Sequence, residues 1–202
     1  MKILYDHKIF YLQKYGGISN YFINLCDRLR LSHEAKIVAP VYINNYLQEF
    51  DKKSKLTFIK LTKHFKYTRK ISNGINNHFF NNYCKFKKPD IVHLTYFDKQ
   101  IFFKKKFKVI VTVYDLIHEI YEKEYNFKYP KNFKYNYLKI ADEIICISEN
   151  TKRDLIKYYN IEEKKITVIY LGVKKEKKLT EIKNLNLDKP YLLFVGDRKN
   201  YK

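Results

Sequence analysis

Short apolar runs alternate along the chain with stretches in which apolar residues recur every three or four positions. Runs of this kind, rich in Ile and Val and bounded by polar residues, predict strands that are buried on both faces. The strands predicted in this way are Lys2–Tyr5, Ala35–Ala39, Leu56–Leu61, Ile91–Leu94, Lys108–Val113, Glu143–Ile147 and Lys165–Ile169.

The amphipathic stretches between these runs predict helices. The first helix is expected to end near Leu31, because one face of it carries Ile18, Tyr21, Phe22, Leu25, Cys26 and Leu29. Three later stretches repeat this spacing, with Ile71, Ile75, Phe79 and Tyr83, then Phe133, Tyr137 and Ile140, then Leu155, Ile156 and Tyr159. The alternation predicts the α/β class: a doubly wound, mainly parallel, Rossmann-like sheet that binds ligands beyond the carboxyl ends of its strands.

The same patterns divide the chain into three parts. Residues 1–172 are expected to form the α/β domain, and the polar, lysine-rich stretch 173–190 is typical of a linker. Residues 191–202 open with an apolar strand, Tyr191–Val195, and a single strand cannot cover its own two faces. We therefore expect 191–202 to be the start of a second domain that is present only in truncated form.

The composition is that of a globular but very basic protein. Apolar residues make up 46% of the 202 positions, which excludes a wholly disordered or collagen-like chain. There are 41 Lys and Arg against 21 Asp and Glu, so the formal net charge is +20. A chain over-supplied with Lys has solvated basic faces by default. Clusters such as 104–108 also suit nucleic acid, anionic lipid or phosphorylated substrates, and charge alone does not decide between these.

The cysteines and the hydropathy of the chain indicate the cellular compartment in which the protein resides. Cys26, Cys84 and Cys146 lie far apart without a CxxC pair, which indicates neither a zinc site nor a disulfide framework and fits a reducing cytoplasm. No cluster of carboxylates indicates a metal site. No apolar run reaches the roughly 18 residues of a membrane-spanning helix, so we do not expect an integral membrane protein.

Paired glycines open the first predicted helix. Gly16 and Gly17 let the backbone approach a ligand closely, and the N–H groups and positive end of a helix favour an anion such as phosphate. The alternative is a plain loop-to-helix turn that Ser19 caps. Because the GxGxxG fingerprint is absent, a nicotinamide or flavin dinucleotide is disfavoured.

Seven segments follow one another in a specific order. They are Gly16–Phe22, Pro89–His93, Val111–Glu119, Ala141–Asp142, Ile145–Lys152, Ile166–Gly172 and Tyr191–Gly196, the last followed by Arg198 and Lys202. Together these segments resemble glycosyltransferase family 4, whose members are retaining enzymes with the two-domain GT-B fold. The resemblance covers nearly the whole chain and identifies it with the N-terminal acceptor domain and the first strand of the donor domain.

The resemblance implies that a sugar is transferred from a nucleotide-sugar co-substrate, with no other cofactor, to a glycan or lipid-linked acceptor in surface polysaccharide assembly. By their positions in the family pattern, Arg198 and Lys202 would hold the donor diphosphate, and Gly16 and Gly17 would face it with backbone N–H groups. Cations and helix N-termini suit this task because negative charge develops as the glycosidic bond breaks.

Residues that follow other strands would serve the catalytic step and the acceptor. Asp115 and Tyr114 are assigned to catalysis, with Asp115 orienting an acceptor hydroxyl; the alternative is an Asp that caps a turn. The acceptor-binding candidates are His93, His118, Ser148 and Glu149. A structural role is equally compatible with His93, and Ser followed by Glu is also typical of a helix cap.

The chain departs from the family pattern at three places. Asn20 stands where many relatives have Arg, and Tyr114 stands where many have His. The family's pair of donor-binding glutamates lies beyond Lys202. We expect either a companion chain that carries the donor domain, or a non-catalytic fragment that binds a partner, glycan or lipid. Nucleic acid is disfavoured as a partner, since the charge is not accompanied by a recognisable binding motif.

Basic and aromatic residues gather around the second predicted helix. Lys63, Lys66, Arg69 and Lys70 lie at the start of the segment Tyr67–Tyr83, which is rich in aromatic residues. This combination favours peripheral contact with anionic lipid at the inner membrane surface; a solvated basic face is the alternative.

Overall fold

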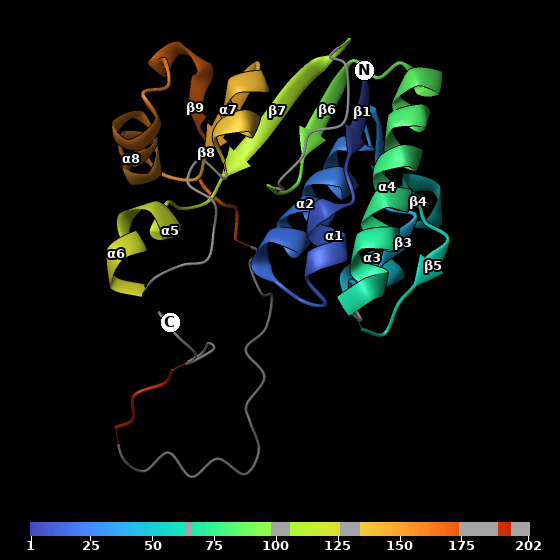
Figure 1. The fold of residues 1–202 in the computed structure, drawn as a ribbon, viewed down its shortest axis with the longest axis horizontal. Coiled ribbons are helices and arrows are strands. Elements are labelled where there is room, and N and C mark those ends of the chain that lie inside the picture. Colours follow the sequence, from blue (N-terminus) through green and yellow to red (C-terminus); the bar gives the residue numbers. More distant parts are fainter. Residues whose placement is uncertain (64–65, 98–105, 126–133, 174–189, 195–202) are drawn as a thin grey trace.

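The computed structural model describes residues 1–63, 66–97, 106–125, 134–173 and 190–194. Within these residues, strands and helices alternate along the chain, and the strands form a central sheet with helices packed on both sides of it (Figure 1).

The central sheet contains seven strands of the described residues, in the order β4-β2-β1-β6-β7-β8-β9, and every neighbouring pair is parallel. The strands are β1 (Lys2–Tyr5), β2 (Glu34–Val38), β4 (Lys55–Leu56), β6 (Ile91–Leu94), β7 (Lys108–Val113), β8 (Glu143–Cys146) and β9 (Ile166–Val168). The predicted fold class, a doubly wound parallel sheet, is confirmed.

The long helices of the structure lie where the apolar periodicity predicts them. They are α1 (Lys8–Leu12), α2 (Gly17–Leu29), α3 (Asn45–Glu49), α4 (Lys66–Lys87), α5 (Ile117–Ile120), α6 (Glu122–Tyr125), α7 (Tyr135–Ile140) and α8 (Glu149–Tyr159), with 3₁₀ turns at Lys52–Ser54 and Glu163–Lys165. The four short helices α1, α3, α5 and α6 were not predicted, because one turn or so carries too little periodicity to stand out from a loop. Phe133, expected in the third helix, lies outside the described residues.

The predicted strand Leu56–Leu61 is wrong in its extent. The chain forms β4 at its start and then leaves the central sheet, so that β5 (Ile59–Lys60) pairs in a separate small sheet with β3 (Val41–Tyr42). The backbone N–H groups of Phe58 and Ile59 both donate to the carbonyl of Pro40, each with an N···O distance of 2.9 Å. This shared acceptor redirects the chain from one sheet to the other.

The expected second-domain strand, Tyr191–Val195, lies only partly within the described residues. Within that part, residues 191–194 have neither helical nor strand conformation, and the apolar side chains of Tyr191, Leu192, Leu193 and Phe194 are exposed. Val195, Arg198, Lys202 and nearly all of the expected linker lie outside the described residues.

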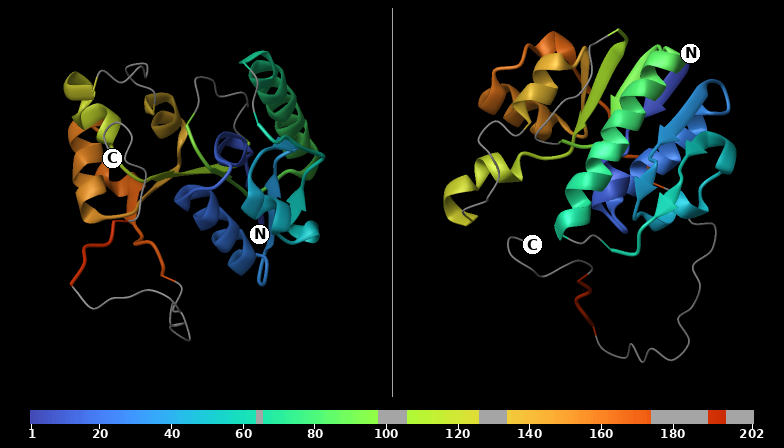
Figure 2. Two further views of the ribbon diagram at one scale, coloured as in Figure 1. Left: turned by 90° about the horizontal axis from the view of Figure 1, so that it is seen from below. Right: turned by 45° about the vertical axis from the view of Figure 1, so that its right-hand side comes forward.

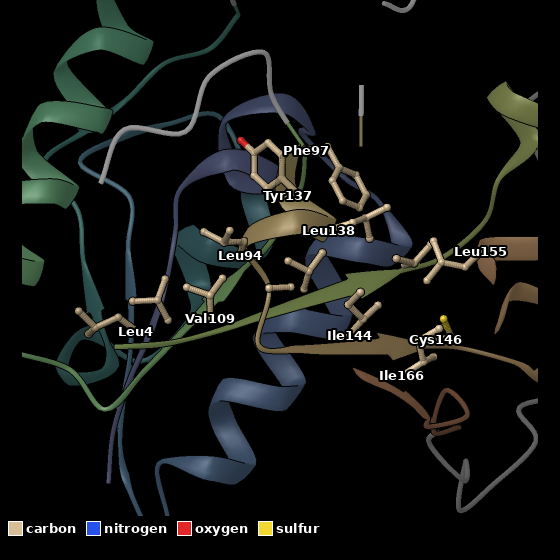
Figure 3. Close-up of a cluster of buried hydrophobic side chains, with 14 of the residues drawn as sticks. Leu4, Leu94, Phe97, Val109, Tyr137, Leu138, Ile144, Cys146, Leu155 and Ile166 are labelled. Atoms are coloured by element: carbon tan, nitrogen blue, oxygen red, sulfur yellow. The ribbon is translucent and has the colours of Figure 1, made fainter. Parts of the chain in front are cut away.

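The core lies on both faces of the central sheet, because successive strand residues point to opposite sides. Ile3 and Tyr5 of β1 pack with Phe22 of α2 on one face. Leu4, the residue between them, joins the other cluster, which contains residues of β6, β7 and β8 together with Leu138 of α7 (Figure 3). In the views of Figure 2, α2 and α4 lie on opposite sides of the sheet. Each fully buried aliphatic or aromatic side chain contributes about 1.5–3 kcal/mol to this packing.

Candidate functional site

The carboxyl ends of the parallel strands meet at one edge of the sheet, and the direction of the chain reverses there between β1 and β6. From β1 the chain goes to β2 on one side, whereas β6, β7, β8 and β9 follow one another on the other side. Ligands of doubly wound sheets bind at such a switch point. The loops after β1, β7 and β8, which carry Gly16, Gly17, Asp115 and Ser148, all start from this edge.

The glycine loop forms the N-terminus of α2. Gly16 is the N-cap and Gly17 the first helical residue, while the Ser19 hydroxyl donates to the Gly16 carbonyl at 3.0 Å rather than capping the helix. A Cβ on Gly17 would meet no atom within 4 Å, so the space in front of this residue is open. A Cβ on Gly16 would lie 2.1 Å from the Gln13 side-chain oxygen, so Gln13 lies directly over the cap. The first-turn N–H groups of a helix can accept an anion in this position.

Asn44 holds the glycine loop in place. Its side-chain amide donates to the Gln13 carbonyl at 2.8 Å, and its side-chain oxygen accepts from the Leu47 N–H at 2.9 Å, which caps α3. The Asn45 N–H in turn donates to the Lys14 carbonyl at 3.0 Å. Sequence reasoning missed Asn44, and the only signal was an Asn at the start of a short apolar stretch.

The loop after β7 carries three of the predicted site residues. Asp115 is exposed, and one of its carboxylate oxygens accepts from the Ile117 N–H at 3.2 Å, so it closes a turn and still faces solvent. His118 is half-buried, and burial, followed by the nearby Lys134 cation, lowers the pKa of its imidazole. Both of these side chains therefore lie at the site edge.

Tyr114 lies differently from its neighbours. Its ring packs edge-on against Tyr21 of α2 with 5.8 Å between ring centroids, and its hydroxyl is buried without a hydrogen-bond partner among the described residues. Burial raises the pKa of this phenol, so it stays protonated. The side chain thus joins the β7 loop to α2, and its hydroxyl is not presented to solvent.

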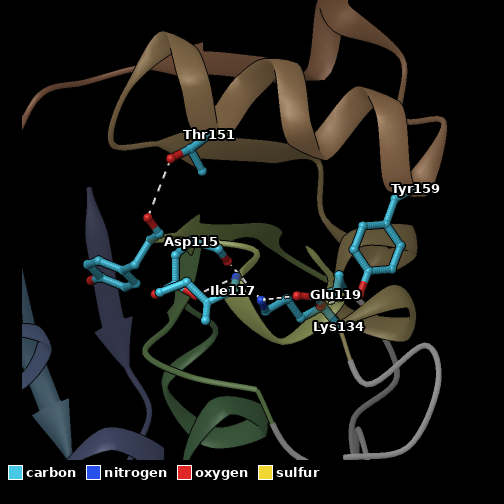
Figure 4. Close-up of polar contacts among 7 residues, drawn as sticks. Asp115, Ile117, Glu119, Lys134, Thr151 and Tyr159 are labelled. Atoms are coloured by element: carbon cyan, nitrogen blue, oxygen red, sulfur yellow. Dashed lines mark hydrogen bonds and ion pairs between the residues drawn. The ribbon is translucent and has the colours of Figure 1, made fainter. Parts of the chain in front are cut away.

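Three buried or half-buried polar side chains anchor the β7 loop (Figure 4). The Lys134 ammonium donates to the Glu119 carboxylate at 3.0 Å and to the Asp115 carbonyl at 2.8 Å. The Tyr159 hydroxyl, at the end of α8, donates to the other Glu119 oxygen at 2.6 Å. The Lys134 side chain is 6% exposed. Sequence reasoning missed this network, because its members are 15 and 40 residues apart along the chain.

Ser148 and Glu149 begin α8. The Ser148 hydroxyl oxygen accepts from the Thr151 N–H at 3.1 Å, so Ser148 caps the helix as the capping interpretation predicts. The Thr151 hydroxyl donates to the Tyr114 carbonyl at 3.4 Å, which joins the loops after β7 and β8 (Figure 4). Glu149 occupies the first turn and is exposed, where a carboxylate favours the helix N-terminus.

His93 does not lie at the site, which corrects its assignment as an acceptor-binding residue. It belongs to β6, is 4% exposed and packs between Tyr5 and Phe22. Its Nε2 lies 2.8 Å from the Thr112 hydroxyl, and burial lowers its pKa to about 3. The alternation of β6 turns this side chain into the core, so the structural interpretation of His93 holds. Arg198 and Lys202 lie outside the described residues.

Asp6, another residue missed in the sequence, links the carboxyl ends of β1 and β6. Its carboxylate accepts from the Thr95 N–H at 2.8 Å and from the Thr95 hydroxyl. Burial raises its pKa to about 6, although the hydrogen bonds with Thr95 and the Lys8 cation act in the opposite direction. The buried Asp6 carboxylate thus holds together the ends of β1 and β6, at the switch point beside the glycine loop.

Replacing Asp6 by Asn will flatten the pH dependence of stability. The unfolded carboxyl ionises near 3.8 and the folded one near 6, so the folded chain binds more protons between these values. The free energy of unfolding therefore falls as pH rises from about 4 to about 6, by about 2 kcal/mol from this group. Urea unfolding at both ends of this range checks it. Equal pH dependence in the wild type and Asp6→Asn would assign the effect to other groups.

Among the described residues, no three His, Cys, Asp or Glu side chains gather closely enough to hold a metal ion. No helix in the described part of the chain has the length and apolar character needed to cross a membrane.

The family model described as Glycosyltransferase Family 4 matches residues 15–177, which is most of the chain. The chain belongs to this family. The matched region contains the glycine loop, the anchored β7 loop and the Ser148 cap, and the fold is the Rossmann-like N-terminal half of the GT-B architecture. No curated protein matches the chain.

Solved structures show the same fold. A glycosyltransferase from Rickettsia africae ESF-5 is 22% identical, with a TM-score of 0.54, and the match covers 85% of this chain and 43% of that one. The lipopolysaccharide outer core galactosyltransferase WaaB in its apo form is 16% identical, with a TM-score of 0.54, and the match covers 88% of this chain and 47% of that one. The chain therefore spans less than half the length of either structure.

Proposed function

We propose that the chain is the acceptor half of a retaining glycosyltransferase, which moves a sugar from a nucleotide-sugar donor to a glycan or lipid-linked acceptor in surface polysaccharide assembly. The observation that carries this proposal is the meeting of the Gly17 helix N-terminus, the exposed Asp115 carboxylate and the Ser148 cap at one edge of a sheet in a family 4 chain. Buried cysteine thiols, with the pKa of Cys26 raised to about 12, suit the reducing cytoplasm in which we place it.

Each part of the edge has a task in the proposed reaction. The N-terminus of α2 stabilises negative charge that develops on the leaving diphosphate. Asp115, with a carboxylate held by the Ile117 N–H, accepts a hydrogen bond from the acceptor hydroxyl and orients it. Glu119 and Lys134 keep the Asp115 backbone still, because Lys134 donates to its carbonyl.

The remaining donor contacts are assigned to Arg198 and Lys202 and to a donor domain supplied by a companion chain. Residues 1–172 act as the acceptor domain, 173–190 as the linker and 191–202 as the start of the donor domain. In this arrangement the exposed apolar residues 191–194 would pair with strands of the companion. Peripheral contact with the membrane also belongs to the proposal.

Nuclear magnetic resonance titrations of the full chain test this assignment. Glycan fragments are expected to shift the amide signals of Gly17, Asp115 and Glu149. UDP, GDP and their sugars should bind to residues 1–202 in the millimolar range or not at all, since Arg198 and Lys202 are the only donor-binding side chains that we assign among them. The internal control is the hollow of about 460 Å³ at the opposite edge, lined by Lys2, Glu34 and Asp90 among others, whose signals should not move. Glycan shifts confined to that hollow, or micromolar nucleotide binding, would contradict the proposal.

A further inference from the structure

We propose that the side-chain amide of Gln13 is an acceptor-binding group, which forms a hydrogen bond with a sugar hydroxyl of the acceptor in front of the glycine loop. This inference rests on the proposed function for the identity of the ligand and adds a further residue to that site. Gln13 is the C-cap of α1 and lies three residues before Gly16. It therefore stands at the entrance to the loop that begins α2.

The backbone of Gln13 is held at both of its polar groups. Its N–H donates to the Ile9 carbonyl at 3.0 Å, and its carbonyl accepts from the Asn44 side-chain amide at 2.8 Å. The following carbonyl, that of Lys14, accepts from the Asn45 N–H at 3.0 Å. The place from which the Gln13 side chain extends is therefore fixed by α1 on one side and by the start of α3 on the other.

The Gln13 amide lies against Gly16. A Cβ on Gly16 would be 2.1 Å from the side-chain oxygen and 3.1 Å from the side-chain nitrogen, so a larger residue could not share this space. Gly16 has a φ of 171°, an extended conformation that any residue adopts, so its backbone does not require glycine. The absence of a side chain at position 16 therefore makes room for Gln13.

The Gln13 amide oxygen is buried and has no hydrogen-bond partner among the described residues. A buried polar atom without a partner is rare in folded proteins, because it has given up water without compensation. A Cβ on Gly17 would meet no atom within 4 Å, so open space begins at the residue next to the one that the amide covers. An amide that lacks a partner beside open space at the site edge is suited to bind a ligand.

The chemistry of an amide matches a sugar. The Gln side chain carries an oxygen that accepts and an NH₂ group that donates, and a sugar hydroxyl can itself donate and accept. The amide has no charge, whereas a phosphate is bound most strongly by cations. A glycan hydroxyl therefore fits Gln13 better than a phosphate does. The amide would hold the acceptor at the glycine loop while Asp115 orients the hydroxyl that reacts.

Nuclear magnetic resonance titrations of the full chain with the methyl glycosides of glucose, galactose and N-acetylglucosamine test the proposal. The side-chain NH₂ signals of Gln13 should move with any glycoside that shifts Gly17 and Asp115. Gln13→Ala should bind that glycoside about tenfold more weakly, which is the loss of one hydrogen bond. The midpoint of thermal unfolding should change by no more than about 2 °C, because the oxygen that is removed has no partner to lose.

Gly16→Ala reaches the same group by another route. The added methyl group would displace the flexible end of the Gln13 side chain without unfolding the loop. Glycoside binding should therefore fall about tenfold in Gly16→Ala and fall no further than in Gln13→Ala when the two changes are combined as Q13A/G16A. Additive losses in the double variant would show that Gly16 acts on the ligand independently, and would overturn the proposal.

Matched control variants change the same residue types elsewhere. Gln48 is exposed on α3, where its side-chain oxygen accepts from the Lys60 ammonium, and a Cβ on Gly74 of α4 would meet no atom within 4 Å. Gln48→Ala and Gly74→Ala should therefore bind the glycosides as the wild type does.

Three results would contradict the proposal. Unchanged affinity in Gln13→Ala would overturn it and leave the glycosyl-transfer proposal standing. Movement of the Gln13 side-chain signals with inorganic phosphate, but with none of the glycosides, would assign the amide to the donor side instead. No shift at the site edge with any of the three glycosides would count against both proposals.

Discussion

Replacing Glu119 by Ala is expected to lower the free energy of unfolding by about 4 kcal/mol. The change leaves the Lys134 ammonium, whose side chain is 6% exposed, without its carboxylate, and it removes the acceptor of the Tyr159 hydroxyl. An uncompensated buried charge costs much more than the loss of one exposed contact. Urea unfolding followed by circular dichroism measures the difference.

The control for this prediction is Glu163→Ala. Glu163 pairs with Lys152 at 2.7 Å, but its side chain is 71% exposed, so its loss should lower the free energy of unfolding far less than the loss of Glu119. Hydrogen exchange should also quicken at Ile117, next to Asp115, in the Glu119 variant and stay unchanged in the control. Equal destabilisation by the two variants would show that the buried network does not anchor the β7 loop.

Asn76→Ala is expected to cost about 4 kcal/mol as well. The Asn76 side chain is fully buried and forms the two hydrogen bonds that a neighbouring strand would form with Val41. Its oxygen accepts from the Val41 N–H and its amide donates to the Val41 carbonyl, each at 2.8 Å. Alanine leaves both backbone groups buried without a partner, at about 1–3 kcal/mol each. The better helix propensity of Ala recovers only about 0.5 kcal/mol. Thermal and urea unfolding give the measurement.

Asn82→Ala is the matched control on the same helix. Asn82 is exposed, and its side-chain amide lies 2.9 Å from the His78 ring, so Ala there should change stability by no more than about 0.5 kcal/mol in either direction. A similar effect at both positions would mean that helix propensity, and not the bond to Val41, decides the outcome at Asn76.

The sequence predicts where a site residue lies only when that residue follows the end of a predicted strand. Gly17, Asp115 and Ser148 each follow a buried apolar run, and parallel strands bring their carboxyl ends to one edge, so their common location follows from the pattern. His93 also lies on such a run. Whether a residue at the end of a strand faces the core or the ligand depends on register and neighbours, and β6 turns His93 between Tyr5 and Phe22.

The sequence by itself determined the fold class, the long helices and six of the seven strands of the central sheet, because apolar periodicity is a local property that burial enforces. The tertiary structure alone decided the division of 55–60 between two sheets, the Asp6–Thr95 brace, the Asn44 support of the glycine loop and the Glu119 network. Each of these joins polar groups from separate elements. Which polar groups pair depends on which side chains become buried when the elements pack together. The spacing of residues along the chain does not encode these pairs.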